Sequence, residues 1–194
     1  MIRLRVIAII AGIVLVSACS TPAFADAVLS VSSPASVVQG STFILDVNIF
    51  GVTDLSAFQF DLSFNPIILQ ATGTITEGSF FQSGGGFVPG TVDNTLGTIT
   101  FNANTLLGPG PGLAGSGTLV VFGFMAIATG TSALNIDSTT FSLLDSTGAN
   151  INATTTNGSV TVQGTTNVPE PSSLMMLGIG LLGLAGLTQR RTIL

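Results

Sequence analysis

The chain of 194 residues carries nine Asp and Glu side chains, four Lys and Arg side chains and no His. All four cations are arginines close to the ends (Arg3, Arg5, Arg190 and Arg191), so residues 26–163 hold eight carboxylates and no basic side chain. This segment cannot neutralise phosphates, which excludes nucleic acid and anionic lipid headgroups as its partners, and Cys19 is a single cysteine that leaves no intrachain disulfide.

The first 25 residues have the organisation of a secretory signal peptide. Two arginines precede an apolar run at 6–16, and the A-x-A pattern of Ala23 and Ala25 predicts cleavage after Ala25. An alternative remains, because Val16-Ser17-Ala18-Cys19 resembles a bacterial lipobox, in which Cys19 would be lipidated. Under both interpretations the rest of the chain is exported.

Between residues 26 and 163 the apolar side chains recur with a period of two, interrupted by Gly, Asn, Asp and Ser. This pattern is typical of short strands joined by turns. For example, the apolar positions from Phe58 to Phe64 alternate with polar ones until Pro66, which has no N–H for a ladder. The pattern predicts strands at 28–32, 43–49, 58–64, 67–75, 98–104, 118–128, 132–136, 140–144 and 159–162. About nine strands around one core predict an all-β, two-sheet sandwich.

Two stretches break this alternation. Residues 78–97 and 107–117 are rich in Gly and Pro, so we expect surface loops there. The glycines do not indicate a phosphate cradle, because no Lys follows them and no helix is signalled behind them.

The predicted strand at 118–128 is apolar at both alternating sets of positions. One set therefore needs a cover other than water. Two interpretations stay open: loops or a sheet edge cover the second set, or Val120, Phe122 and Phe124 form an exposed face that binds a partner.

Three stretches together resemble successive segments of a cohesin domain: GVTDLSAFQFDLSFNPIIL (51–69), GTLVVFGFMA (117–126) and DSTTFSLLDSTGANINATTTNGSVTV (137–162). Asn65 stands in Phe64-Asn65-Pro66 where the family usually has Asp. The resemblance implies a nine-stranded jelly-roll sandwich, here at 26–163, that binds a protein partner through one sheet face. The typical partner of the family is a calcium-loaded dockerin.

After a linker at 164–173, the chain ends in a short apolar run at 174–187 and two arginines. We expect a transmembrane helix and basic tail at 174–194, although fourteen apolar residues give only about 21 Å of helix against a hydrocarbon core of about 30 Å. The order of Pro169, Glu170, Pro171, an apolar helix, Arg190 and Arg191 resembles the PEP-CTERM sorting signal. This resemblance implies a Gram-negative host and recognition by an exosortase, a membrane transpeptidase, after transient anchoring. The alternative is a permanent tail anchor.

Other chemistry has little support. A carboxylate pair such as Asp54 and Asp61 could serve glycoside hydrolysis, but Trp and Tyr for sugar stacking and basic groups for orientation are missing from 26–163. We therefore predict a protein that is not an enzyme and has no organic cofactor. Calcium is a weaker hypothesis at Asp145, Thr147 and Asn150, since hard cations bind such oxygens, while Asp near Gly usually makes only the turn.

These features predict an exported, non-enzymatic protein of the cell surface or extracellular matrix that acts as a cohesin-like interaction module. The alternative is a carbohydrate-binding module of an exopolysaccharide or biofilm matrix.

Overall fold

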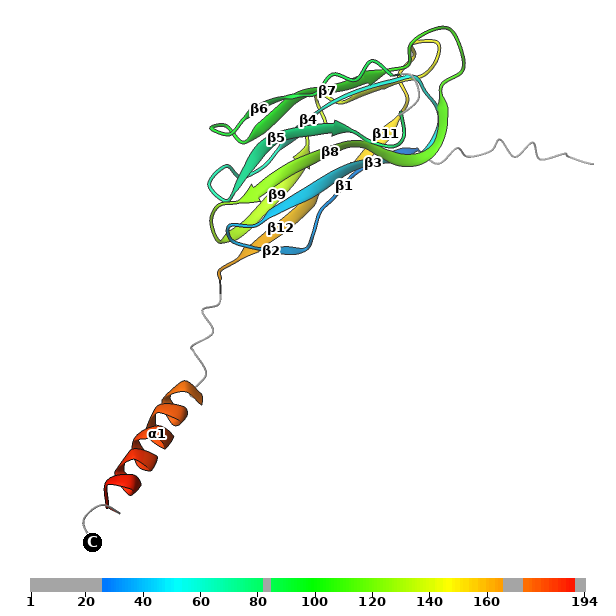
Figure 1. Cartoon of the computed structure of the whole chain (residues 1–194). Helices are drawn as coiled ribbons and strands as arrows, with labels where there is room; N and C mark the ends of the chain where they lie inside the picture. Colours follow the sequence, from blue (N-terminus) through cyan, green and yellow to red (C-terminus); the bar gives the residue numbers. More distant parts are fainter. Residues whose placement is uncertain (1–25, 82–84, 166–172, 191–194) are drawn as a thin grey trace, which may run out of the picture.

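Alternating side chains of the middle segment build two packed β-sheets (Figure 1). The computed structural model describes residues 26–81, 85–165 and 173–190. Within these ranges the strands are β1 (Ala27–Ser32), β2 (Ser36–Val38), β3 (Thr42–Leu55), β4 (Ala57–Ser63), β5 (Leu69–Glu77), β6 (Thr91–Asp93), β7 (Thr98–Thr105), β8 (Leu113–Ala126), β9 (Gly130–Ile136), β10 (Ser142–Leu144), β11 (Ala153–Thr156) and β12 (Gly158–Gln163), and the helix is α1 (Ser173–Arg190). The predicted all-β, two-sheet sandwich is confirmed.

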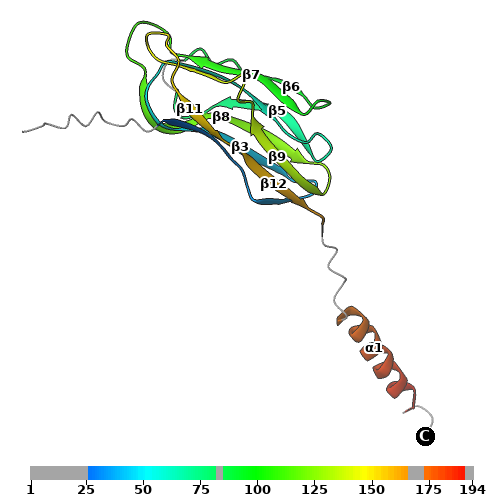
Figure 2. The same ribbon diagram turned by 180° about the vertical axis from the view of Figure 1, so that it is seen from behind.

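Sheet one has the strand order β11-β1-β3-β8-β5, and sheet two has the order β2-β12-β9-β4-β7-β6, with β10 paired to β4. In each sheet, the strand that comes first in the chain pairs in parallel with the strand that comes last: β1 with β11 in sheet one, and β2 with β12 in sheet two. The described chain therefore begins at one end of the sandwich, the Ala27 end, and leaves it at the other, the Gln163 end, as both ribbon views show (Figures 1 and 2).

The core between the sheets is aromatic. On β4 the alternate residues Phe58, Phe60 and Leu62 are buried, as the sequence pattern predicts. The Phe60 and Phe122 rings meet edge to face with centroids 6.3 Å apart, and Phe64 meets Phe124 in the same way at 5.1 Å. Each such pair adds about 0.5–1.5 kcal/mol beyond area burial.

This packing corrects the expected partner face on β8. Val120, Phe122 and Phe124 are each 0 % exposed, because they are the β8 side chains that fill the core. Leu119 is buried as well, at an irregularity in the β3–β8 pairing where Val47 is opposite Val120 and Asn48 opposite Thr118. The interpretation of this face as an exposed binding surface is therefore wrong.

All nine predicted strands are present, with shifted ends. The predicted strand at 67–75 starts only at Leu69, because Ile68 and Leu69 donate their N–H groups to Asn65 O and first complete a turn. The sequence pattern missed β2, β6 and β11. These strands have three or four residues, which is too short to display an alternation; β10 is equally short, but it lies within the longer stretch predicted at 140–144.

The described residues of the first Gly-rich stretch, 78–81 and 85–97, pair with neighbouring strands. The stretch contains β6, and Val88 exchanges backbone hydrogen bonds with Ala103 of β7 at 2.8 and 3.1 Å. Two glycines allow this approach: a Cβ on Gly85 would lie 2.3 Å from Asn104 Oδ1, and one on Gly90 would lie 2.3 Å from Asn102 Oδ1. In the second stretch β8 already begins at Leu113, where the pattern predicts loop.

The turn after β6 also closes an edge of sheet one. Asn94 Oδ1 accepts the N–H of Ala71 at 2.8 Å, and Asn94 Nδ2 donates to Ala71 O at 3.0 Å. The amide thus occupies the backbone groups of the edge strand β5 as a neighbouring strand would, which blunts an edge that otherwise invites pairing between chains.

Aspartates stabilise the turns. Asp93 Oδ1 accepts the N–H groups of Thr95 and Leu96 at 2.8 and 2.9 Å, and the Leu96 N–H is the main cause that lowers the pKa of Asp93. Asp137 Oδ1 accepts both the N–H and the hydroxyl of Thr139, and the Thr139 N–H lowers the pKa of Asp137 most.

Two further aspartates act at the Ala27 end. Asp54 joins two loops, because it accepts the Gly112 N–H on Oδ1 and the Ser146 hydroxyl on Oδ2 at 2.7 Å. The Ser146 hydroxyl is the main cause of the lowered pKa of Asp54. Asp145 Oδ1 accepts the Thr147 hydroxyl at 2.7 Å, which is the main cause of the lowered pKa of Asp145.

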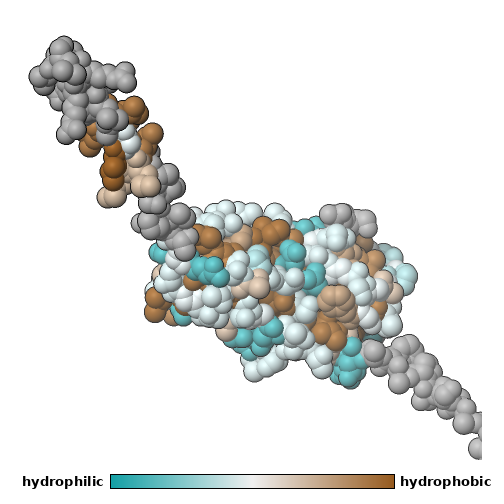
Figure 3. All heavy atoms as spheres, turned by 90° about the horizontal axis from the view of Figure 1, so that it is seen from below, coloured by the Kyte–Doolittle hydropathy of each residue, from teal (hydrophilic) through white to brown (hydrophobic). Residues whose placement is uncertain are grey.

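Apolar side chains of the helix α1 are visible on the face of it that Figure 3 shows. Its described apolar side chains are 59–75 % exposed: Met175, Met176, Leu177, Ile179, Leu181, Leu182 and Leu184. A helix over this part of 174–194 agrees with expectation, whereas no helix within the described ranges has both the length and the apolar character needed to cross a membrane.

Substituting Gly78 should destabilise the sandwich because of a backbone collision. A Cβ at this position would lie 2.2 Å from Thr118 O, so we expect Gly78→Ala to cost about 1–3 kcal/mol. Gly110→Ala is the matched control, since nothing lies within 4 Å of its Cβ position. Thermal or urea unfolding measures both, and equal effects of the two substitutions would contradict the packing at Gly78.

Acid should also destabilise the protein. The lowered pKa values of Asp54, Asp93, Asp137 and Asp145 lie below the ordinary 3.8, so around that pH the unfolded chain binds more protons than the folded one. The stabilisation is complete above the unfolded pKa and is lost as the pH falls through the folded values. We expect a lower Tm at pH 3 than at pH 6 by circular dichroism, and a smaller decrease in Asp93→Asn. An equal or higher Tm at pH 3 would disprove this.

Candidate functional site

The outer face of sheet two contains an apolar hollow. Its volume is about 240 Å³. The residues around it are Ala57, Phe58, Gln59, Gly86, Val88, Phe101, Ala103, Asn104, Thr105, Ser142 and Leu144. They come from β4, β7, β10 and the segment 85–88, and the hollow lies towards the Ala27 end.

Strand register explains why this face is hollowed. In one row across the sheet Ser142 is opposite Gln59, which is opposite Ala103, and in the next row Leu144, Ala57 and Thr105 follow one another. Small side chains thus occur in both rows: Ala57 lies in the middle of the second row, and Ala103 lies on β7 beside Gln59 in the first. Larger apolar side chains surround them, of which Phe101 is 52 % exposed and Val88 43 % exposed.

Phe101 reaches the outer face through a β-bulge. The β4–β7 register shifts between Phe60 and Leu62, so Thr100 and Phe101 together lie opposite Asp61. Phe101 adopts a φ of 60°, and its N–H donates to Asp61 Oδ1 at 2.7 Å. The bulge reverses the alternation of β7, so that Asn102 and Asn104 point into the core and Phe101 points out.

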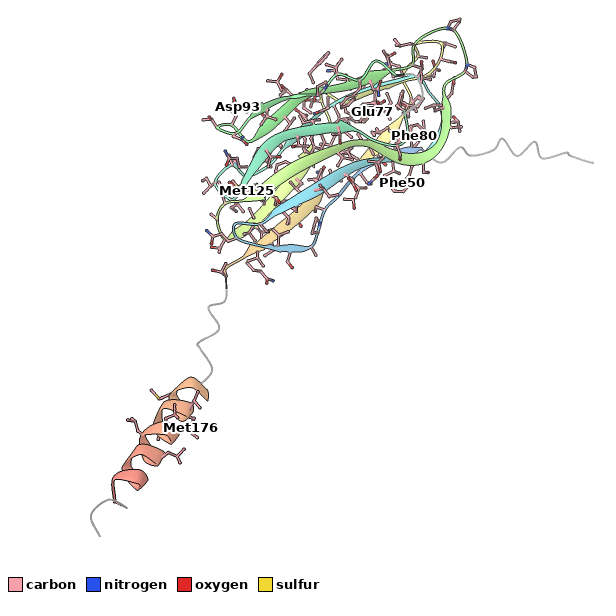
Figure 4. All side chains as sticks on the ribbon, in the orientation of Figure 1. Phe50, Glu77, Phe80, Asp93, Met125 and Met176 are labelled. Carbon is pink, nitrogen blue, oxygen red and sulfur yellow. The ribbon has the colours of Figure 1, made fainter. Side chains whose placement is uncertain are left out.

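The two inward asparagines form hydrogen bonds with residues of β4, β5 and β7. Asn102 Nδ2 donates to Phe60 O and Ile99 O, each at 3.2 Å. Asn104 Nδ2 donates to Glu77 Oε1 at 2.6 Å, and Thr105 N–H donates to Asn104 Oδ1. Glu77 lies beside Phe80 near the Ala27 end, whereas Asp93 lies at the other end (Figure 4). These bonds fix β7, and with it the floor of the hollow.

The hollow has the size and chemistry of a site for protein side chains. Small-molecule pockets usually enclose about 300–1,000 Å³, so 240 Å³ with an open apolar lining suits one or two apolar side chains of a partner better than a whole ligand. Its lining residues contain no His, Cys, Asp or Glu, so the hollow offers no general acid, base or strong nucleophile. An exposed Phe is of the residue class that is enriched at protein–protein interfaces.

Sequence-predicted site residues lie elsewhere. Asp145, Thr147 and Asn150 share one turn, in which Asp145 Oδ1 already accepts donors from Thr147 and Ala149. Among the described residues, no group of three or more His, Cys, Asp and Glu could hold a metal ion, and calcium at this turn stays an untested prediction. The carboxylates considered for hydrolysis are occupied separately, Asp54 by Gly112 and Ser146 and Asp61 by Phe101.

Several predicted residues fall outside the described residues: Cys19, Ala23, Ala25, Pro169, Glu170, Pro171 and Arg191. Arg190 is the last residue of α1. Their roles in cleavage, lipidation and sorting remain predictions.

Sequence reasoning missed Val88, Phe101 and Leu144. Strict alternation along 98–104 places Phe101 in phase with the buried Ile99, and therefore in the core. The hollow depends on the register shift at Asp61. This shift arises from the pairing of β4 with β7, and no local sequence pattern indicates it.

Family comparison assigns most of the chain. A model described as "Cohesin domain" matches residues 27–162, and one described as "PEP-CTERM protein-sorting motif" matches residues 167–191. No curated protein is significantly similar in sequence.

Solved structures share the fold. The non-cellulosomal cohesin from the archaeon Archaeoglobus fulgidus has a TM-score of 0.59 at 21 % identity, over 72 % of this chain and 92 % of that one. A type II cohesin from the cellulosome of Acetivibrio cellulolyticus has a TM-score of 0.60 at 17 % identity, over 70 % and 95 %. The third ScaC cohesin of the same organism, solved in complex with the ScaB dockerin, has a TM-score of 0.58 at 18 % identity, over 70 % and 98 %.

The family match covers well over half of the 194 residues, and the two-sheet jelly-roll sandwich is the fold of these solved cohesins. The chain therefore belongs to the cohesin domain family, and its cohesin domain is followed by a PEP-CTERM sorting motif.

Proposed function

We propose that the protein is an exported, non-enzymatic interaction module that binds a protein partner at the apolar hollow of sheet two. The observation that carries this proposal is the half-exposed Phe101 beside the small floor residues Ala57 and Ala103. Aromatic side chains, Phe among them, are enriched in protein–protein interfaces relative to the rest of the surface. The ScaC cohesin of Acetivibrio cellulolyticus was solved with a dockerin, which supports a dockerin-like partner.

The charge of the module constrains that partner. Residues 26–163 supply eight carboxylates and no cation, so any ion pair across the interface takes its Lys or Arg from the partner. We infer a partner with an apolar side chain that enters the hollow and basic residues that meet the acidic surface, which would raise the association rate at low salt.

The C-terminal motif gives the module its destination. We infer signal-peptide export, with lipidation at Cys19 as the alternative, followed by exosortase processing near Pro169-Glu170-Pro171 at the surface of a Gram-negative cell. The hollow lies towards the Ala27 end, whereas the chain continues to the sorting motif from the Gln163 end. A module attached through its C-terminal side would thus present the hollow away from the attachment.

Capture tests the binding proposal. Immobilised protein should retain a discrete protein from the culture supernatant of the producing cells, and that protein, once identified, should bind at least tenfold more weakly to Phe101→Ala. A tenfold loss corresponds to about 1.4 kcal/mol. Ile67→Ala is the control, because Ile67 is 75 % exposed but follows β4 at the end remote from the hollow.

Two results would overturn this proposal. Equal losses in Phe101→Ala and Ile67→Ala would remove the hollow as the binding site. Retention of the protein on purified exopolysaccharide, without capture of any protein, would favour the carbohydrate-binding alternative.

Intact-mass measurement tests the sorting proposal. Protein recovered from the surface or medium of the producing cells should lack α1, because the transpeptidase cuts near Pro169-Glu170-Pro171. Replacing these three residues by Ala should leave α1 attached, whereas replacing Gly164, Thr165 and Thr166, which precede the matched motif, should leave processing unchanged. Normal processing of the first variant would contradict exosortase sorting.

A further inference from the structure

We propose that Asp61 is a positioning residue, which holds Phe101 in a strained backbone conformation and thereby displays its ring at the hollow. The role of the displayed ring rests on the proposed binding function, whereas the contact between Asp61 and Phe101 does not depend on it. The two residues lie on neighbouring strands, β4 and β7, at the one register shift between them.

The backbone of Phe101 is unusual within this protein. Its φ of 60° makes it the only residue other than glycine with a positive φ among the described residues. The others are Gly40, Gly51, Gly73, Gly97, Gly108, Gly115, Gly130 and Gly148. An L-residue with a Cβ is disfavoured in this region, and a bulky aromatic residue especially so. Where the chain elsewhere needs this conformation it uses glycine, so a phenylalanine here indicates that the ring itself is needed.

Asp61 supplies the interaction that offsets this cost. Its Oδ1 accepts the Phe101 N–H at 2.7 Å, a short distance that is typical of a bond to a charged acceptor, which is stronger than one between neutral groups. Phe101 has no paired residue on β4, because it lies in the bulge. On the opposite edge of β7, β6 pairs with Thr98–Thr100 and Val88 pairs with Ala103, so Phe101 is unpaired there too. The carboxylate therefore takes the place of the missing strand partner at this residue.

Without this bond β7 could adopt a regular conformation that lacks the bulge. Regular alternation would turn Phe101 to the side of Ile99, which is fully buried, and would turn Asn102 outward. Moving Phe101 inward would bury its large apolar ring, so the relaxed strand has a driving force. Asp61 thus selects the display of the aromatic ring over its burial.

Hydrogen exchange and hydroxyl-radical footprinting of the full chain, both read by mass spectrometry, test this assignment. In Asp61→Ala we expect the Phe101 amide to exchange at least tenfold faster and the Phe101 ring to oxidise at least threefold more slowly, relative to wild type. Asp61→Asn keeps an acceptor oxygen and should restore much of both signals. Asp46→Ala, which removes a carboxylate from β3 in the other sheet, should change neither, and the half-exposed Phe50 serves as the reference ring.

A second variant separates positioning from general unfolding. If Asp61→Ala lowers the Tm, adding Phe101→Gly should recover part of the loss, because glycine adopts a positive φ without a steric cost. Unchanged exchange and oxidation at Phe101 in Asp61→Ala, or no recovery of a lowered Tm by Phe101→Gly, would overturn the proposal. Neither readout involves a partner, so a failure here is distinct from a failure of Phe101→Ala to weaken capture.

Discussion

The lack of any basic side chain between residues 26 and 163 is the constraint on which the rest of the structure depends. No carboxylate of this segment can form an ion pair within it, so its aspartates are stabilised by backbone N–H groups and hydroxyls instead. Asp54, Asp93, Asp137 and Asp145 each become the centre of a turn or a loop junction in this way. The same chemistry at Asp61 produces the bulge that builds the candidate site. Inside the domain the carboxylates thus fix turns by accepting hydrogen bonds. They can form ion pairs only with basic residues from outside this segment, such as those of a partner.

The two faces of sheet two differ in the size of their side chains. Between the sheets, Phe60 packs against Phe122 and Phe64 packs against Phe124, at centroid distances typical of aromatic pairs. On the outer face of sheet two, small side chains on β4 and β7 leave a floor that no side chain of the sandwich fills. The buried asparagines beneath it fix the backbone without adding bulk. A rigid fold with a preformed depression lowers the ordering cost of binding.

Most of the fold could be predicted from the sequence, because eight of the described strands have six or more residues and so display their alternation, and Asn65-Pro66 ends one of them. The binding face could not. An exposed binding surface is one of the two interpretations that the sequence leaves open for the apolar run on β8, yet Val120, Phe122 and Phe124 are fully buried in the core. Phe101 suggested core and lies outside, because one register shift inverts the residues that follow it. Both errors come from pairing between distant strands, which determines the face of each side chain and which local periodicity does not contain.

The central claim is that a protein partner docks on the outer face of sheet two. The most direct test is amide hydrogen exchange of the protein with and without its captured partner. Binding should slow exchange in the segments around the hollow, 85–88, 101–105 and 142–144, and leave β1 and β3 of sheet one unchanged. Protection confined to sheet one, or no protection near Phe101, would contradict the account.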